Sequence, residues 1–169
     1  MHYVVDIDAG HLLRALEAVR HEVITPQAML ASIGESLFRV NQARHDQGLA
    51  PDGTRWKELS PFTVAQKGGK GRILRANGDM LDSFHPDVTG VELRLGFSDR
   101  KARWHHFGTP ARTITPKKAK ALAFGGMFRK RVRHPGLPAR PLVGFPTSDE
   151  QLVADVTADH LELVLKSVR

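Results

Sequence analysis

The N-terminal part of the chain carries apolar side chains at two different spacings. The β-branched and aromatic run from His2 to Ile7 predicts a short strand that ends before Gly10. Beyond Gly10 the spacing changes to three and four residues, which places apolar side chains on one face of a helix. An amphipathic helix is therefore expected next, with a face formed by Leu12, Leu13, Leu16 and Val19.

A second, longer helix is predicted from Thr25 to about Gln47. Thr25 is a suitable N-cap residue, and Pro26 follows at the first helical position, where a missing N–H costs no hydrogen bond. Gly48 is expected to form the C-terminal cap. The apolar positions again follow the period of a helix, so one face should be buried: Met29, Ile33, Leu37 and Val40.

Turn signals interrupt the chain after this helix. The segment from Leu49 to Leu59 contains a Pro-Asp-Gly turn close to Trp56, which predicts a loop held in place by one large side chain. Ser60 and Pro61 repeat the combination of a cap residue and proline, so a short helix should begin there and end near Gly68.

Short elements of both kinds are predicted in the middle of the chain. Asp79 to Phe84 should form a helical turn, and the alternating segment from Val88 to Phe97 indicates a strand or hairpin that turns near Gly90. The next segment, Arg100 to Phe107, is expected to be a helix that Gly108 ends.

The C-terminal third combines extended and helical signals. Ile114 to Phe124 is predicted to be extended and to lead into a turn at Gly125 and Gly126. Ser148 to Gln151 has the spacing of a capping box, so a terminal helix should begin there. Its apolar positions have amphipathic spacing: Leu152, Val153, Val156, Leu161, Val164 and Val168.

The order of these elements predicts an α+β fold in a single compact domain over residues 1–169. A length of 169 residues with 41% hydrophobic residues is enough for one core, and we expect a small mixed or antiparallel sheet packed by helices. Residues 109–147 are predicted to form an extended basic arm or hairpin within this domain. The prolines at 135, 138 and 141 favour an irregular or edge segment in its second half.

The net charge of +7 hides a strong asymmetry along the chain. The segment from Arg100 to Ser148 contains twelve Lys and Arg residues and no Asp or Glu, so its formal charge is +12. The remaining residues carry 13 basic and 18 acidic groups, which gives −5. One part of the chain is therefore an electrostatic partner for the other, although nucleic acid, an acidic protein surface or an anionic membrane would also suit the basic part.

The densest basic cluster extends from Phe128 to Pro141. Its Arg and Lys side chains could contact nucleic-acid phosphates, pair with acidic groups of a neighbouring subunit, or remain in solvent. Only Phe128 is aromatic within the cluster, which argues against stacking on single-stranded bases. Proline and glycine stiffen the segment, and a stiff charged arm favours docking on a partner.

The sequence offers no catalytic constellation, and we predict a protein without enzymatic activity, bound metal or cofactor. Cysteine is absent, so a thiolate nucleophile and a thiolate metal site are excluded. The glycine-rich segment Lys67 to Arg72 lacks the spacing of a phosphate-binding P-loop. His85 lies near carboxylates only in sequence, and Asp79 and Asp82 are more simply explained as the polar start of a helical turn.

The adjacent histidines 105 and 106 do not fit a metal site, because neighbouring residues of a helix point about 100° apart. One of the two is expected to pack beside Trp104 and Phe107, and the other to be exposed. Neither an export signal nor an apolar run of about 18 residues is present, so we expect a soluble protein without a membrane partner.

Four segments carry a family resemblance that covers nearly the whole chain. They contain, in order, Gly53 and Trp56; Leu81; His106, Phe107 and Gly108; and Pro138, Arg140, Pro141 and Gly144. In their order and spacing they resemble the phage virion morphogenesis family, the tail-completion proteins of Mu-like and related tailed phages. The resemblance implies a structural protein of the head-proximal tail end or neck, which is needed for tail completion and for joining filled heads to tails.

The resemblance also implies partners and a location. Related neck and terminator proteins form rings around the DNA path, so we expect a homo-oligomeric ring that binds tail-tube and head-connector proteins. The protein would be part of the virion, in the tail or neck, after assembly in the cytoplasm of the bacterial host. In a cyclic ring each copy presents one surface to a different surface of its neighbour.

The charge asymmetry suits such a ring. Basic side chains of one copy would contact acidic side chains of the next: Arg129, Lys130, Arg131, Arg133 and Arg140 on one side, and Asp149, Glu150, Asp155, Asp159 and Glu162 on the other. Two alternatives remain: the basic arm faces phage DNA in the channel, or the protein is a basic DNA-binding regulator that contacts duplex phosphates.

Overall fold

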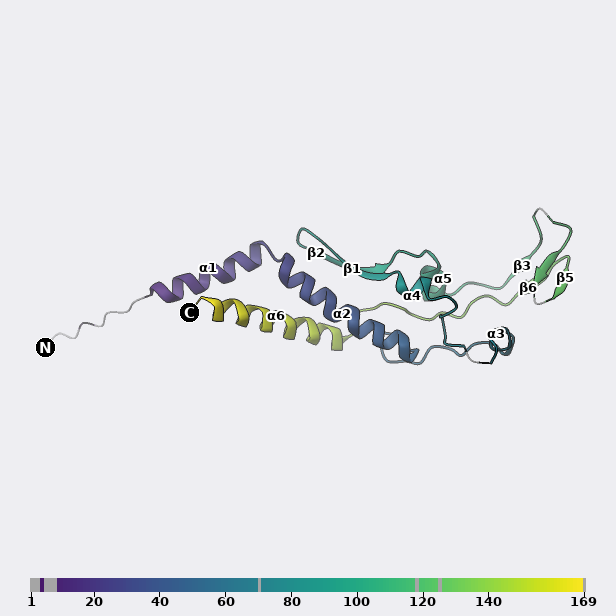
Figure 1. Cartoon of the computed structure of the whole chain (residues 1–169), viewed down its shortest axis with the longest axis horizontal. Coiled ribbons are helices and arrows are strands. Elements are labelled where there is room, and N and C mark those ends of the chain that lie inside the picture. Colours follow the sequence, from purple (N-terminus) through teal and green to yellow (C-terminus); the bar gives the residue numbers. More distant parts are fainter. Residues whose placement is uncertain (1–3, 5–8, 70, 118, 125, 169) are drawn as a thin grey trace. The chain divides into compact units, whose positions relative to one another are not determined.

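The computed structural model describes the chain except for residues 1–3, 5–8, 70, 118, 125 and 169 (Figure 1). The strand predicted from His2 to Ile7 therefore lies outside the described residues, apart from Val4. The α+β class is confirmed. Within the described residues, the strands form three two-stranded sheets, β1 with β2, β3 with β6 and β4 with β5.

The chain divides into two compact units, each built from segments that are distant in sequence. The first unit contains Met1–Val40, Pro86–Leu95 and Phe145–Arg169, and the second contains Asn41–His85 and Gly96–Gly144. From the sequence alone we predicted one compact domain over residues 1–169.

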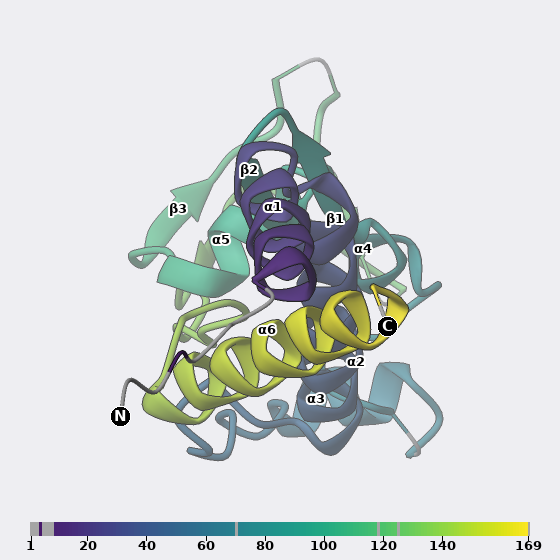
Figure 2. The ribbon, with the colours of Figure 1, turned by 90° about the vertical axis from the view of Figure 1, so that its left-hand side faces the viewer.

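The first unit contains helix α1 (Gly10–Ile24), most of α2 (Gln27–Gln47) and α6 (Thr147–Ser167). Helix α1 contacts α6 (Figure 2). His160 Nε2 of α6 lies 2.8 Å from Glu22 Oε2 of α1. Ile33 and Leu37 are buried, as the helical period of α2 predicts. A side chain at Gly34 would lie 2.9 Å from Leu93 Cδ1, so only glycine allows this close packing.

Two predicted helix starts are wrong in detail. Helix α2 begins at Gln27, and the Thr25 hydroxyl donates to the His21 carbonyl at 2.7 Å, so Thr25 caps the end of α1 instead of the start of α2. Helix α6 begins at Thr147 with Pro146 as its N-cap and has no side-chain cap bond, so the capping box predicted at Ser148 is not formed. In both places the local sequence pattern did not give the residue at which the helix begins.

The second unit has its own apolar core. Ala50, Trp56, Met80, Leu81, Ala102 and Leu142 are buried together, with Ile73, Leu74 and Phe97 packed against them. The helices of this unit are short: α3 (Pro61–Gln66), α4 (Asp79–Asp82) and α5 (Lys101–Phe107). Helix α4 contributes Met80 and Leu81 to the core, and α5 contributes Ala102. The Ser60 hydroxyl accepts from the Thr63 N–H at 3.2 Å, which confirms the predicted cap of α3.

Strands β1 (Phe84–Thr89) and β2 (Glu92–Phe97) form the predicted hairpin, and Gly90 has a positive φ of 61° at its turn. The hairpin begins earlier than the predicted Val88 because Phe84 already belongs to β1.

The predicted extended run from Ile114 to Phe124 is interrupted. Its two ends belong to β3 (Arg112–Ile114) and β4 (Leu122–Phe124), which pair antiparallel with β6 (Val132–His134) and β5 (Met127–Arg129). Pro116 lies between β3 and β4 and cannot donate to a ladder. The result is a long hairpin, called the basic hairpin below, with an outer strand pair and an inner strand pair.

Candidate assembly interface

The four segments that carry the family resemblance meet in the second unit. Trp56 is 4% exposed, and its Nε1 donates to the Pro141 carbonyl at 2.8 Å. Leu81 is buried in the same core. Gly53 has a φ of +84° in the turn that leads to Trp56, and a side chain at Gly144 would lie 3.1 Å from Pro51. These residues build one core, so the segments act together as a scaffold.

Arg140 belongs to this scaffold. Its side chain is 4% exposed; Nε and Nη2 donate to the Lys57 carbonyl at 2.8 and 2.6 Å, and Nη2 also donates to the Glu58 carbonyl at 3.1 Å. Burial lowers the pKa of Arg140, and the Glu58 carboxylate opposes that shift. The guanidinium of Arg140 is therefore already bonded inside the chain, and its contact with a partner stays a prediction that would require these bonds to break.

Helix α5 holds the same segment from the other side. The Arg140 N–H donates to the His105 carbonyl at 2.7 Å, and the Leu142 N–H donates to His106 Nδ1 at 3.2 Å. Gly108 ends α5 with a φ of +72°, and a Cβ there would lie 2.7 Å from the Leu137 carbonyl oxygen. Glycine is needed at this position both for the conformation and for the close approach of the two backbones.

His105 and His106 are both half-buried, so the prediction that one of them is exposed is wrong. The rings of His106 and Phe107 meet edge to face at 4.5 Å. Trp104 instead lies beside the Arg100 guanidinium, 5.8 Å from it. Phe107 is itself exposed, although its neighbours in the triplet hold the scaffold.

The sequence interpretation missed His45, which is buried in an aromatic cluster. Its Nε2 donates to the Leu142 carbonyl at 2.8 Å, and its ring stacks on Trp56 at 5.8 Å and meets Phe84 at 5.2 Å. Burial lowers the pKa of His45. The helical period that buries Ile33 and Leu37 continues to His45 and could have identified it.

The basic hairpin begins at a backbone clamp. Thr109 and Leu137 exchange two N–H···O bonds of 3.0 Å each, so the projecting part extends from 109 to 137. Pro138 to Gly144, including Pro138 itself, follows the clamp and joins the scaffold, whereas the predicted arm extended to residue 147. The cations Arg129, Lys130, Arg131 and Arg133 are exposed, and none forms an ion pair with another described residue.

The predicted acidic contacts on α6 differ in exposure. Glu150, Asp155 and Asp159 are exposed, and Asp155 accepts from Gln151 at 2.7 Å. Asp149 is 1% exposed in the single chain, so its contact with a partner stays a prediction and would require this side chain to become exposed. Asp155, Asp159 and Glu162 recur every three or four residues and therefore form an acidic stripe along α6.

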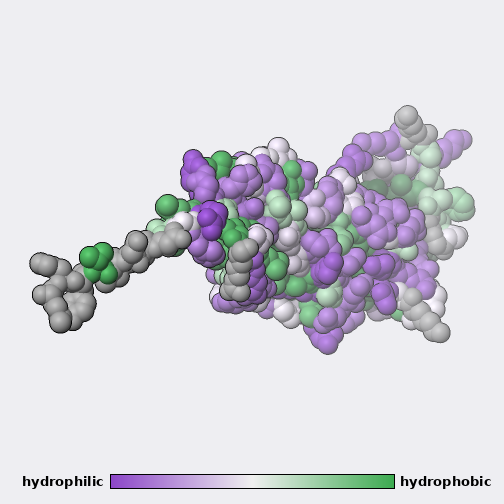
Figure 3. Space-filling model, turned by 60° about the vertical axis from the view of Figure 1, so that its left-hand side comes forward, coloured by the Kyte–Doolittle hydropathy of each residue, from purple (hydrophilic) through white to green (hydrophobic). Residues whose placement is uncertain are grey.

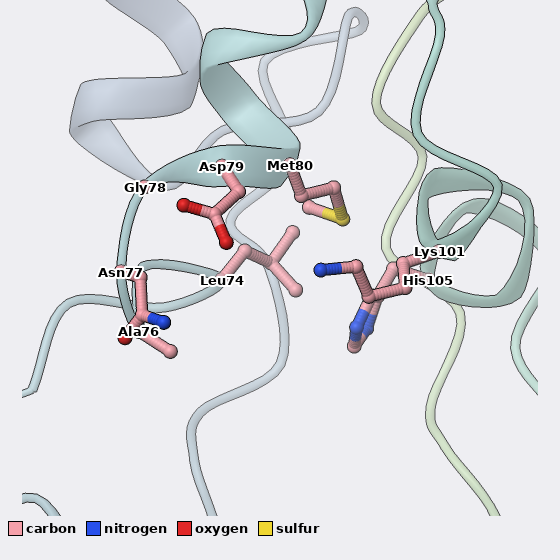
Figure 4. A pocket seen from close by; sticks show the side chains of 8 residues that line it. All are labelled: Leu74, Ala76, Asn77, Gly78, Asp79, Met80, Lys101 and His105. Carbon is pink, nitrogen blue, oxygen red and sulfur yellow. The ribbon is translucent and has the colours of Figure 1, made fainter.

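A pocket of the second unit is too small for a typical ligand. It has a volume of about 140 Å³ and is lined by Leu74, Ala76, Asn77, Gly78, Asp79, Met80, Lys101 and His105 (Figure 4). Small-molecule sites usually measure about 300–1,000 Å³. Lys101 pairs with Asp99 at 3.0 Å, and burial, followed by the nearby Arg140 and Lys101, lowers the pKa of His105.

The other candidate chemical groups bond within the chain. His85 donates to the Ser83 carbonyl at 2.8 Å, and Lys67 donates to the carbonyls of Arg72 and Arg75 at 2.9 and 2.6 Å. Among the described residues, no three His, Asp or Glu side chains gather in a way that could hold a metal ion. Within the same residues, no helix is long and apolar enough to span a membrane.

Comparison with known proteins identifies relatives along most of the chain. The family model described as the phage virion morphogenesis family matches residues 7–162. Tail completion protein S of Escherichia phage P2 is 29% identical over 134 residues, which covers 78% of this chain and 81% of that protein. No solved structure matches.

Proposed function

This chain belongs to the phage virion morphogenesis family, and we propose that it completes the head-proximal end of the tail, or the neck, so that filled heads can join. Its structural role in phage tail assembly follows from the family and from the similar phage P2 protein. The name of that relative, tail completion protein S, is the observation that carries the proposal.

The geometry of the second unit supports a protein that docks on other components of the tail. Trp56, Arg140 and His106 hold the segment after the clamp rigidly against the second unit. The exposed cations of the basic hairpin remain free to contact a partner. A rigid base with a projecting charged element suits docking, because less conformational freedom is lost when it binds.

We propose that copies of the chain form a ring in which the basic hairpin of one copy contacts the acidic stripe of the next. The exposed cations at 129, 130, 131 and 133 would meet Asp155, Asp159 and Glu162, with Glu150 at the end of the stripe. Opposite charges on two different surfaces of one chain are the arrangement that a cyclic, head-to-tail contact requires.

Negative-stain microscopy of particles made without this protein tests the joining role. We expect full heads and separate, finished-looking tails in the same lysate. Complementation with the intact gene should restore joined particles. Empty heads in the absence of the protein would contradict the proposal and indicate a role in packaging or retaining DNA.

A second candidate function is contact with phage DNA in the channel. The observation that favours it is the set of exposed cations on the basic hairpin, which lack carboxylate partners among the described residues. Gel shifts with duplex DNA at rising salt test this function, because phosphate contacts weaken steeply with salt. Binding that keeps a sequence preference would instead indicate a regulator.

A further inference from the structure

Helix α1 exposes most of its large apolar side chains. No residue of α1 is buried. Five of its large apolar side chains are more than half exposed: Leu12 at 59%, Leu13 at 64%, Leu16 at 57%, Val23 at 66% and Ile24 at 57%. Hydrophobic side chains also reach the surface on the side of the chain shown in Figure 3. These five residues are called the α1 face below.

The exposed side chains share one side of the helix. At about 100° per residue, the α1 face covers roughly 120° of the helix circumference. The half-buried Ala15, Ala18 and Glu22 lie on the other side, and Glu22 contacts His160 of α6. Helix α1 therefore turns two alanines and Glu22 inward, while five of its large apolar side chains stay exposed, although an apolar stripe usually faces a core.

Two charged side chains beside the α1 face indicate which partner fits it. Glu17 and Arg20 lie near the middle of α1, where they form an exposed pair at 2.7 Å. Leu12 and Leu13 lie at one end of the helix, and Val23 and Ile24 lie at the other. If a second copy of α1 is rotated by 180° to run antiparallel, its apolar ends meet the apolar ends of the first copy. Its acidic position then meets the basic position of the first copy.

We propose that two copies of the chain pair through their α1 faces, with the helices antiparallel about a two-fold axis. In this arrangement Glu17 of each copy faces Arg20 of the other, and Leu13 faces Ile24 of the other. A parallel arrangement would place Glu17 against Glu17 and Arg20 against Arg20, which is unfavourable. A two-fold contact uses the same surface on both copies, so it is self-complementary as required.

This pairing is separate from the proposed ring contact. The ring uses the basic hairpin and α6, whereas the pairing uses α1 alone. A two-fold contact closes after two copies and cannot extend into a ring by itself. The pairing is therefore the expected form of the free protein, and it can be tested without phage particles.

Light scattering during gel filtration measures the mass of the purified full chain. We expect a mass twice that of the 18.7 kDa chain. Replacing Leu16→Glu together with Val23→Glu should give the single-chain mass with an unchanged circular dichroism spectrum, since both side chains are exposed in the single chain. Arg14→Glu is the matched control, because Arg14 is exposed on the other side of α1 and the dimer should persist.

Cross-linking tests the antiparallel register, because the chain contains no cysteine of its own. A mixture of a Leu13→Cys variant and an Ile24→Cys variant should form a disulfide-linked pair under mild oxidation. Each variant alone should stay largely unlinked, since its two cysteines would lie roughly 16 Å apart along the paired helices.

Three results would overturn the inference. They are a wild-type chain that stays single at the highest concentration reached, a dimer that survives both glutamate substitutions, and cross-links within each single-cysteine variant but not between them. Failure of this pairing would leave tail completion intact, and particles lacking the protein would still show it.

Discussion

Replacing Arg140 is the sharpest test of the scaffold, because sequence and structure assign this residue to opposite places. The sequence pattern predicts a contact with a partner, whereas the structure buries the guanidinium against the carbonyls of Lys57 and Glu58. We expect Arg140→Ala to destabilise the single chain. Arg133→Ala is the matched control, because Arg133 is exposed on the basic hairpin.

The expected loss follows from the three contacts at 2.6, 2.8 and 3.1 Å. A hydrogen bond to a charged group contributes about 1.5–3 kcal/mol. The contacts share two carbonyls and are not independent, so we expect a loss of about 3 kcal/mol for Arg140→Ala. Arg140→Lys keeps one donor group and should lose about half as much.

Urea unfolding followed by circular dichroism measures these free energies, and gel filtration follows assembly in the same samples. Arg133→Ala should unfold within roughly 0.5 kcal/mol of the wild type. An Arg140→Ala variant with wild-type stability and impaired assembly would refute the argument. It would return Arg140 to the partner contacts.

Three further predictions follow from other parts of the molecule. Burial lowers the pKa of His45 and of His105, so the unfolded chain binds these protons before the folded chain does as the pH falls below about 6.5. The free energy of unfolding should fall by up to about 1.4 kcal/mol per pH unit for each group until the pKa of the folded chain is passed. Urea unfolding at several pH values should show a weaker pH dependence of this free energy for His45→Phe. Gly108→Ala should lower the melting temperature clearly more than Gly53→Ala, because both glycines have positive φ but only a Cβ at Gly108 meets backbone; equal shifts would contradict this account. Changing Arg129, Lys130 and Arg131 together to Glu should remove species larger than the proposed dimer from light scattering at high protein concentration while leaving the melting temperature unchanged, and larger species that persist would remove the proposed hairpin contact.

The local elements were predictable because their signals are local. The helical period identified the buried face of α2 at Ile33 and Leu37, and the cap pattern at Ser60 located α3. Gly90 at the turn of the β1–β2 hairpin and Gly108 at the end of α5 both have a positive φ, a conformation that glycine adopts readily. The order of motifs also identified the family, since the resemblance depends on sequence alone.

The fate of single charged side chains was not predictable. Arg140 and the exposed Arg133 belong to the same acid-free segment, yet one binds carbonyls that lie 82 and 83 residues away in sequence. Asp149 and Glu150 are adjacent on α6, and only the first is buried. Local charge does not reveal which cation or carboxylate meets a distant backbone group.

Residue type and spacing were enough to predict the α+β class, the amphipathic helices, the family and the charge asymmetry. Packing between distant segments shows in addition that Arg140 holds the scaffold, that the basic hairpin ends at Leu137, and that large apolar side chains of α1 stay exposed. The spacing of apolar residues shows which side chains share one face of a helix. The segments that bury that face, however, are distant in sequence. For α1 that cover is absent among the described residues of the single chain, and the proposed second copy would provide it.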